Sequence, residues 1–136
     1  LGGSAYFRRE GWLKRMAEVF LEHNGVGLYG STGNLGHPRT TIFAHIRTTG
    51  FWCSPEVMNA YPQKITEHHQ RYPFEHGKNG LTRWCMSSGI PARVVDFSNV
   101  WEHPQWHLGP QGYHAGEQID LLVGDRMTCP PFYPHP

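Results

Sequence analysis

A glutamate followed by closely spaced glycines is the strongest catalytic candidate in the sequence. Glu75 lies in RYPFEHGKNGLTR, directly before Gly77, Gly80 and a helix that we predict over residues 78–88. The dipole of a helix stabilises an ionised carboxylate at its N-terminus. An ionised carboxylate can accept a proton from a hydroxyl group, so Glu75 is a candidate general base. The spacing by itself fits an ordinary first-turn charge equally well.

The ten histidines raise the question of a metal site. A zinc site needs three or four converging ligands and supporting contacts behind them. The sequence has no His-Glu-x-x-His motif and no Cys-x-x-Cys pair, so the pattern favours surface or core roles for most of these side chains. The candidate ligands are His68, His69, His76, His103, His107 and His114.

The three cysteines, Cys53, Cys85 and Cys129, are odd in number and widely spaced. This usage is typical of buried free thiols in a reducing compartment. Cys53 precedes a predicted helix start, where a lowered thiol pKa could create a nucleophile. Its aromatic neighbours, Phe51 and Trp52, favour a buried strand end instead.

A glycine-rich stretch, VGLYGSTGNLGHP, has glycines at positions 27, 30, 33 and 36. It resembles the Thr-Gly-x-x-Gly loop of NAD(P)-binding short-chain reductases. That loop needs a following helix whose N-terminus holds the pyrophosphate. Pro38 and the segment 40–43 favour a strand here. The alternatives are a turn that shapes a surface loop, or a backbone beside a bound substrate, since glycine permits close approach.

The elements that position these residues follow from periodicity and turn signals. Apolar residues on one helical face predict an amphipathic helix that ends at Asn24-Gly25. Ser54-Pro55 predicts a helix start, and β-branched and aromatic segments predict strands. The predicted helices cover 8–23, 55–61, 78–88 and 117–128, and the predicted strands 26–30, 40–54 and 90–97; the polar segment 63–72 is also compatible with a helix. This order predicts one α/β domain over residues 1–136.

Composition narrows the class of protein. A chain of 136 residues can form one domain with a modest core, and 13% aromatic residues predict a core rich in large rings. A net charge of +1 without a Lys/Arg run argues against nucleic acid as a partner. No apolar run of about 18 residues occurs, so no transmembrane segment is predicted.

Four segments resemble one family when they are taken in order. They are VGLYGSTGN, HIRTTGFWCSPEVM, FEHGKNGLTRWCMSSGIPARVV and GEQIDLLVGDRMT, and they span residues 25–128. Together they are similar to the C-terminal half of bacterial and viral glycosyltransferase-like proteins of the GT-A type. The resemblance implies an α/β fold whose mixed sheet has flanking helices, like the second half of a nucleotide-diphospho-sugar transferase.

The resemblance also implies roles for single residues. Glu75 holds the place of the acidic residue that deprotonates the acceptor hydroxyl in inverting transfer, with His76 in place of the usual aspartate. His114 is the expected ligand of a divalent Mn or Mg ion, because many GT-A enzymes use a late histidine. The residues expected to bind substrate are Gly30, Ser31, Thr32, Gly33, Asn34, His45, Arg47, Thr48, His76, Arg83, Glu117 and Gln118.

The sequence departs from the family in one important feature. GT-A enzymes that depend on metal hold the cation with an Asp-x-Asp pair, and this sequence has none. A leaving diphosphate then needs arginines such as Arg39, Arg47 and Arg83, or a metal. We therefore expect one of two things. The chain is either the acceptor-side part of a longer enzyme that uses a nucleotide-sugar and a glycan or lipid-linked acceptor, or a related domain that does not bind a nucleotide-sugar by itself. The expected location is cytoplasmic, with a membrane-peripheral position by analogy with glycan-precursor assembly.

Two other functions remain open from the sequence. A non-catalytic carbohydrate-binding domain would stack sugars on aromatic side chains such as Trp101, Trp106, Tyr113 and Tyr133, although core packing explains these equally well. An NAD(P)-binding reductase would use the loop over 27–36.

Overall fold

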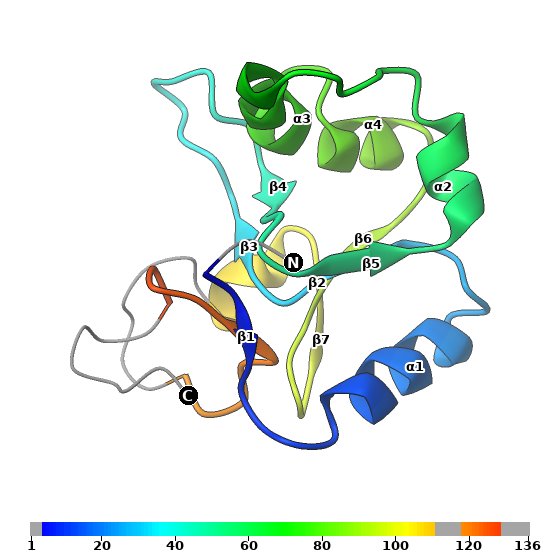
Figure 1. The fold of residues 1–136 in the computed structure, drawn as a ribbon, viewed down its shortest axis with the longest axis vertical. Helices are drawn as coiled ribbons and strands as arrows, with labels where there is room; N and C mark the ends of the chain where they lie inside the picture. Colours follow the sequence, from blue (N-terminus) through cyan, green and yellow to red (C-terminus); the bar gives the residue numbers. More distant parts are fainter. Residues whose placement is uncertain (1–3, 111–117, 129–136) are drawn as a thin grey trace.

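A four-stranded mixed sheet forms the centre of the molecule, and helices cover both of its faces (Figure 1). The structure is a computed structural model that describes residues 4–110 and 118–128. The sheet has the order β5-β2-β6-β7, with bounds Phe51–Cys53, Leu28–Gly30, Ala92–Val95 and Val100–Glu102. The central pair, β2 and β6, is parallel, and the two outer pairs are antiparallel. The mixed α/β class predicted from the sequence is therefore confirmed.

Two short strand pairs lie beside the central sheet. Strand β3 (Gly33–Asn34) pairs antiparallel with β4 (His45–Ile46), and this hairpin carries the first part of the candidate site. Strand β1 (Tyr6–Phe7) pairs antiparallel with β8 (Val123–Gly124), which joins the two ends of the described chain.

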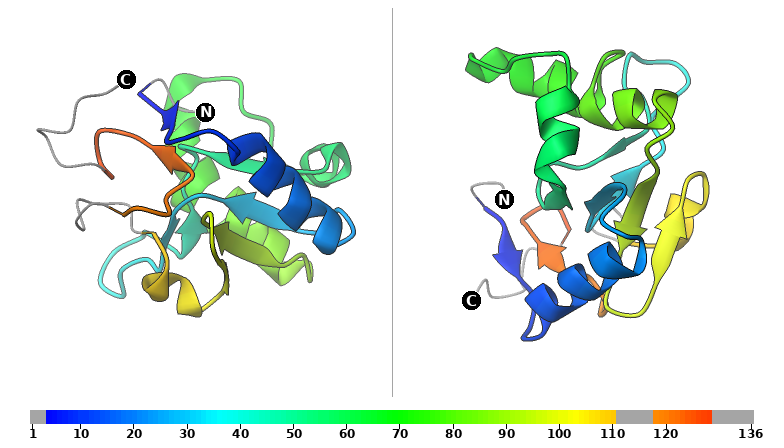
Figure 2. Two further views of the ribbon diagram at one scale, coloured as in Figure 1. Left: turned by 90° about the horizontal axis from the view of Figure 1, so that it is seen from below. Right: turned by 90° about the vertical axis from the view of Figure 1, so that its right-hand side faces the viewer.

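The helices divide between the two faces of the sheet, as the two further views in Figure 2 also show. Helix α1 covers one face, and α2, α3 and α4 lie on the other side (Figure 1). Their bounds are Trp12–Glu22, Pro55–Ala60, Arg71–His76 and Leu81–Ser87, and two 3-10 segments, η1 and η2, cover His68–Gln70 and Gln105–Leu108. None of these helices is long and apolar enough to cross a membrane.

Alternation along the central strands produces two cores. In β2, Leu28 packs into a cluster with residues of α2 and α4, while Tyr29 packs into a cluster with Val19 of α1. Successive side chains of a strand point to opposite faces, so one strand supplies both clusters. The sheet is therefore packed on both faces, and this packing holds in place the strands from which the candidate site is built.

Local signals placed several elements correctly. Helix α1 lies within the predicted 8–23 helix and is followed by Asn24 and Gly25, both with positive φ. Ser54 is the N-cap of α2 and Pro55 is its first residue. The helix predicted over 78–88 begins only at Leu81, after Gly80.

The helix predicted over 117–128 is wrong for its described part, 118–128. Leu121, Leu122 and Val123 are fully buried there, and Val123–Gly124 forms strand β8 instead of a helix. Strand β8 pairs with β1, whose residues lie more than a hundred positions earlier in the sequence. A partner that distant leaves no trace in local periodicity, so tertiary pairing overrode the local pattern.

Candidate functional site

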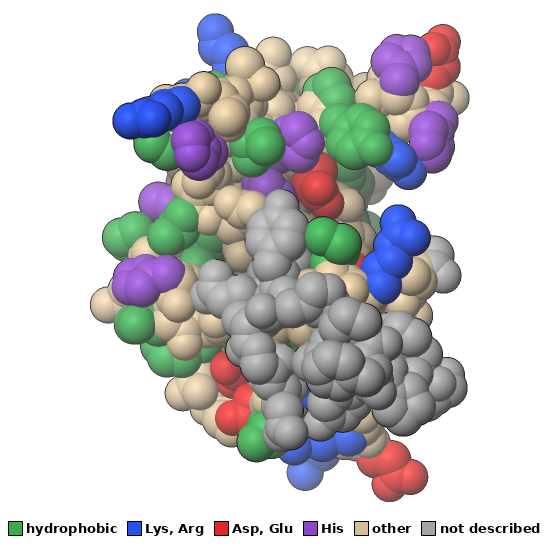
Figure 3. All heavy atoms as spheres, turned by 90° about the vertical axis from the view of Figure 1, so that its left-hand side faces the viewer, with side chains coloured by type: hydrophobic (Ala, Val, Ile, Leu, Met, Phe, Trp, Pro, Cys, Tyr) green, Lys and Arg blue, Asp and Glu red, His purple; other side chains and the backbone are tan. Residues whose placement is uncertain are grey.

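Glu75 and His45 line one small cavity between α3 and the β3–β4 hairpin. The cavity has a volume of about 210 Å³. Its lining residues are Asn34, Ile42, His45, Arg47, Tyr72, Glu75, His76 and Met127. In Figure 3, histidine side chains lie around an acidic one in the upper half of the face shown. The cavity thus combines a carboxylate with two imidazoles.

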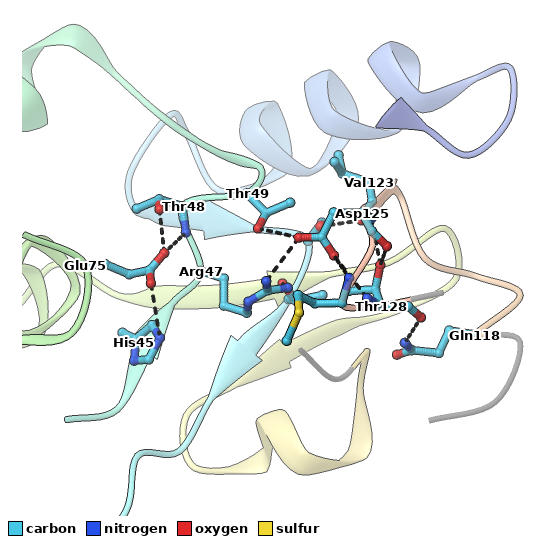
Figure 4. Close-up of polar contacts among 12 residues, drawn as sticks. His45, Arg47, Thr48, Thr49, Glu75, Gln118, Val123, Asp125 and Thr128 are labelled. Carbon is cyan, nitrogen blue, oxygen red and sulfur yellow. Dashed lines mark hydrogen bonds and ion pairs between the residues drawn. The ribbon is translucent and has the colours of Figure 1, made fainter. Parts of the chain in front are cut away.

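Thr48 anchors one oxygen of the Glu75 carboxylate. The backbone N–H of Thr48 donates to Oε2 over 2.7 Å, and the Thr48 hydroxyl donates to the same oxygen. The other oxygen, Oε1, lies 3.9 Å from Nε2 of His45 (Figure 4). The Glu75 side chain is 22% exposed. One oxygen is therefore held by the protein, and the other faces His45.

The helix that carries Glu75 is not the expected one. Glu75 lies in the last turn of α3, and Gly77 follows as the C-cap. The expected effect of a helix N-terminus on Glu75 is therefore wrong, because α4 starts six residues later. Gly77 and Gly80 instead make a tight turn between the two helices, where a Cβ at Gly77 would lie 2.7 Å from the Pro73 carbonyl oxygen. Thr48, rather than a helix dipole, stabilises the carboxylate.

His45 presents an acceptor nitrogen to the cavity. Its side chain is 5% exposed, and Nδ1 lies 2.7 Å from the carbonyl oxygen of Phe43. A carbonyl oxygen can only accept, so Nδ1 carries the proton in this contact. In the neutral ring, Nε2 then has a free lone pair, which is directed to the side of Glu75.

The surroundings of His45 favour its neutral form. Burial lowers the pKa of His45 most, and the hydrogen bond to Phe43 and the charge of Glu75 oppose this effect. The nearby His76 and Arg47 lower the pKa further, so it lies below the usual 6.5. His45 is therefore an uncharged hydrogen-bond acceptor at neutral pH.

His76 completes the polar lining. Its ring centroid lies 5.5 Å from that of His45 and 6.0 Å from that of Tyr72. Its Nδ1 atom is buried and has no hydrogen-bond partner among the described residues. Buried polar atoms are rarely left without partners in folded proteins.

Arg47 lines the cavity, but its charge is already paired. Its Nη2 donates to Oδ2 of Asp125 over 3.1 Å, and its Nη1 donates to the Thr32 hydroxyl over 3.4 Å (Figure 4). Thr49 donates to the same Asp125 oxygen over 3.1 Å. The pair is largely buried, with side-chain exposures of 15% and 7%. Arg47 therefore connects the cavity to the segment around β8.

Asp125 remains ionised at this position. Burial by itself would raise the pKa of Asp125. The charge and hydrogen bond of Arg47, the Thr49 hydroxyl and the backbone N–H of Met127 outweigh burial, and the pKa lies below the usual 3.8. In the sequence, Asp125 is only a single aspartate in GDR, because its role depends on a partner 78 positions away.

The glycine-rich stretch supports the cavity from behind and does not line it, apart from Asn34. Ser31 and Thr32 are fully buried, and the Ser31 hydroxyl donates to the Val123 carbonyl over 3.2 Å. A Cβ at Gly30 would overlap Ile46, and one at Gly33 would lie 2.6 Å from Val94. Their expected contact with substrate is therefore not found at the cavity. These residues let strands approach closely, and no helix follows them before residue 55, so the arrangement that the reductase reading needs is missing.

The other expected substrate residues lie apart from the cavity. Arg83 stacks on the Phe43 ring at 4.0 Å and lines a separate hollow with Lys78. Gln118 donates from Nε2 to the Thr128 carbonyl over 2.9 Å and does not line the cavity. Glu117 and the expected metal ligand His114 lie outside the described residues.

The sequence did not predict three of the residues that line the cavity, Ile42, Tyr72 and Met127. Nothing in their local sequence distinguishes them from ordinary surface residues.

The remaining chemical candidates also have clear places. Burial raises the pKa of the Cys53 thiol and raises that of Cys85 to about 12, which disfavours a thiolate nucleophile.

Trp106 is 1% exposed and cannot stack on a sugar, whereas Trp101 is half-buried. Tyr113 and Tyr133 fall outside the described part of the chain. Within residues 4–110 and 118–128, no three His, Cys, Asp or Glu side chains are grouped to hold a metal ion.

No protein-family model, curated protein or solved structure matches the chain. Its function has to be argued from the chemistry of the site itself.

Proposed function

We propose that this chain is the acceptor-binding part of a glycosyltransferase in which Glu75 is the general base. The observation that carries the proposal is the one-sided anchoring of its carboxylate. Thr48 occupies Oε2, which leaves Oε1 with a lone pair at the cavity. A general base needs both features, a fixed orientation and a free acceptor oxygen within reach of the reacting proton.

The chemistry of the step follows from this geometry. An acceptor hydroxyl donates to Oε1 of Glu75, and its oxygen attacks the anomeric carbon of an activated sugar. A new C–O bond forms, the bond from that carbon to the phosphate oxygen breaks, and the proton passes to Glu75. The nucleoside diphosphate leaves with the electron pair of the broken bond.

The charge of the departing diphosphate is not matched by the described cavity residues. Arg47 is paired with Asp125, and the described residues do not fit a divalent cation because no three ligating side chains are grouped there. A divalent cation, when bound, would neutralise a leaving diphosphate. The proposal therefore concerns the acceptor side, where Glu75, His45 and Thr48 act together.

The test is Glu75→Gln in the full-length protein, assayed for transfer from a panel of nucleotide-sugars to glycan and lipid-linked acceptors. The amide oxygen can still accept from Thr48, but it cannot take the proton. We expect turnover to fall about 10²-fold or more, the usual scale for losing a general base. Circular dichroism should show an unchanged fold.

Glu10→Gln is the matched control, because Glu10 is exposed and lies outside the cavity. It should leave turnover at the wild-type level. Equal turnover in Glu75→Gln and wild type would exclude Glu75 as the base. A wild-type protein that transfers no sugar from any donor of the panel would overturn the proposed function as a whole.

A further inference from the structure

Two hydrogen-bond acceptors lie side by side at the cavity, and the described residues supply neither of them with a donor. One is Oε1 of Glu75, whose partner oxygen is already bound by Thr48. The other is Nε2 of neutral His45, whose Nδ1 proton is committed to Phe43. They lie 3.9 Å apart. Two acceptors cannot bond each other, so a ligand at this pair has to supply the hydrogens.

The spacing and the volume limit what that ligand can be. A separation of 3.9 Å is too long for a direct hydrogen bond, which ends at about 3.2 Å. The oxygens of hydroxyl groups on adjacent carbons lie somewhat closer together than this, so each hydroxyl can donate to one acceptor. A volume of about 210 Å³ is below the roughly 300–1,000 Å³ of pockets for drug-sized ligands, which fits a single sugar ring.

We propose that Oε1 of Glu75 and Nε2 of His45 together bind a vicinal diol of the acceptor sugar. If Glu75 is the general base of the proposed function, the hydroxyl that donates to Glu75 is the one that becomes glycosylated. Its neighbour donates to His45, which selects the acceptor and orients the ring. His76 lines the same cavity, so a second polar side chain lies beside the pair of acceptors.

Protonation of His45 should close this site. The charged and titratable groups that face His45 are Glu75 and His76 from α3 and Arg47 after β4. When His45 is protonated, Nε2 becomes a donor and pairs with Glu75, so both acceptors are lost to a diol. Binding should therefore be complete at neutral pH and fall as the pH drops through the acid side of the histidine range.

The test is binding of methyl glycosides to the full-length protein without any nucleotide-sugar. The probes are the methyl pyranosides of glucose, mannose and galactose and their monodeoxy analogues. Binding is followed by calorimetry and by the NMR shift of the His45 ring protons. We expect at least one parent sugar to bind, and removal of either of two adjacent hydroxyls to weaken its binding about tenfold.

Paired variants separate the two nitrogens of His45. Asparagine can place an N–H donor near the position of Nδ1 but lacks a group at Nε2, whereas glutamine can reach the Nε2 position. His45→Asn should weaken binding about tenfold, and His45→Gln should retain more of it. His69→Asn is the control, because His69 is 75% exposed and lies outside the cavity.

The outcomes distinguish this inference from the proposed function. The inference fails if none of the sugars binds, if the deoxy analogues bind as tightly as the parent, or if His45→Asn binds normally. The deoxy analogues on wild-type protein decide the matter even if His45→Asn does not fold. If binding depends on the diol but no donor gives sugar transfer, the diol site stands and the proposed transferase function is excluded. If sugar transfer requires Glu75 but requires neither a vicinal diol on the acceptor nor His45, the proposed transferase function stands and the diol site is excluded.

Discussion

At the scale of single residues, the chemistry of the cavity depends on which atoms are already occupied. Thr48 binds Oε2 of the Glu75 carboxylate with two donors, which leaves Oε1 as the oxygen on the side of His45. The imidazole of His45 would present either nitrogen if Phe43 did not accept from Nδ1. The residue types made both side chains candidates, and their hydrogen-bond partners determine which atoms remain available to accept a hydrogen bond.

His45 gives a prediction for the pH dependence of stability. Its folded-state pKa is lowered, so the unfolded chain binds the proton more readily. The stabilising contribution is complete above about pH 6.5, the unfolded pKa, and is lost as the pH falls through the lowered folded pKa. Urea unfolding of wild type should therefore show a loss of stability as the pH falls below about 6.5, on the acid side of the histidine range. In His45→Asn this loss should be smaller.

His69→Asn again serves as the comparison, because His69 is exposed and paired with a solvated Glu67. It should leave the wild-type pH profile in place. A His45→Asn profile that runs parallel to wild type would show that His45 does not titrate differently in the folded state.

At the scale of elements, the close approach of β2 and β4 sets the position of His45. Gly30, the last residue of β2, has no room for a side chain because a Cβ would overlap the Ile46 side chain. The backbone N–H of Ile46 also donates to the buried hydroxyl of Thr82 in α4 over 2.9 Å. Strand β4 is thus held between the sheet and α4, which brings His45 against α3 and Glu75.

Gly30→Ala should destabilise the protein by about 1–3 kcal/mol, the usual cost of overpacking a core. Ile46→Ala should cost about 2–5 kcal/mol because it leaves a cavity. The two losses should not add, since the shortened side chain makes room for the new methyl group. Urea unfolding of both single variants and of the double variant measures this coupling. Additive losses would show that the contact between β2 and β4 is looser than described.

At the scale of the whole molecule, the segment around β8 reaches the cavity through one buried ion pair. Strand β8 is held to the N-terminal strand β1, and Asp125 after it pairs with Arg47. The same aspartate accepts from Thr49 and from the backbone N–H groups of Met127 and Thr128. The first and last described segments therefore fix a residue that lines the candidate site.

Asp125→Asn should destabilise the protein by about 3–5 kcal/mol, because it leaves the charge of Arg47 buried without its partner. The lowered pKa of Asp125 adds a pH signature. Its contribution is present above the unfolded pKa of about 3.8 and is lost as the pH falls through the lowered folded pKa. Unfolding measured from neutral pH into the acid range should show a shallower decline for Asp125→Asn than for wild type.

Asp120→Asn provides the contrast for this prediction. Asp120 pairs with Arg9 at 3.6 Å in a contact where both side chains are more than 40% exposed, at 48% and 42%. An exposed pair of this kind contributes about 1 kcal/mol or less. Equal losses from both substitutions would contradict a buried role for Asp125.

The elements that could be predicted correctly from the sequence are those whose signals are local. The apolar stripe of α1, the Ser54-Pro55 start of α2 and the β-branched run of β6 depend on neighbours within a few residues, so periodicity and capping were enough to place them. Glu75 could be chosen from its place in a motif, although the reason inferred from spacing, a helix N-terminus, was wrong.

The surroundings of these residues depend on contacts between segments that lie far apart in the sequence. The strand at Val123–Gly124 depends on β1, and the orientation of Glu75 depends on Thr48, which lies 27 positions away. The ion pair of Arg47 depends on Asp125. The burial of residues 30–33 behind the cavity also depends on such contacts, because the neighbouring strands pack closely against them. Long-range hydrogen bonds and packing join residues that local sequence signals do not connect, and they select which of the candidate side chains share one cavity.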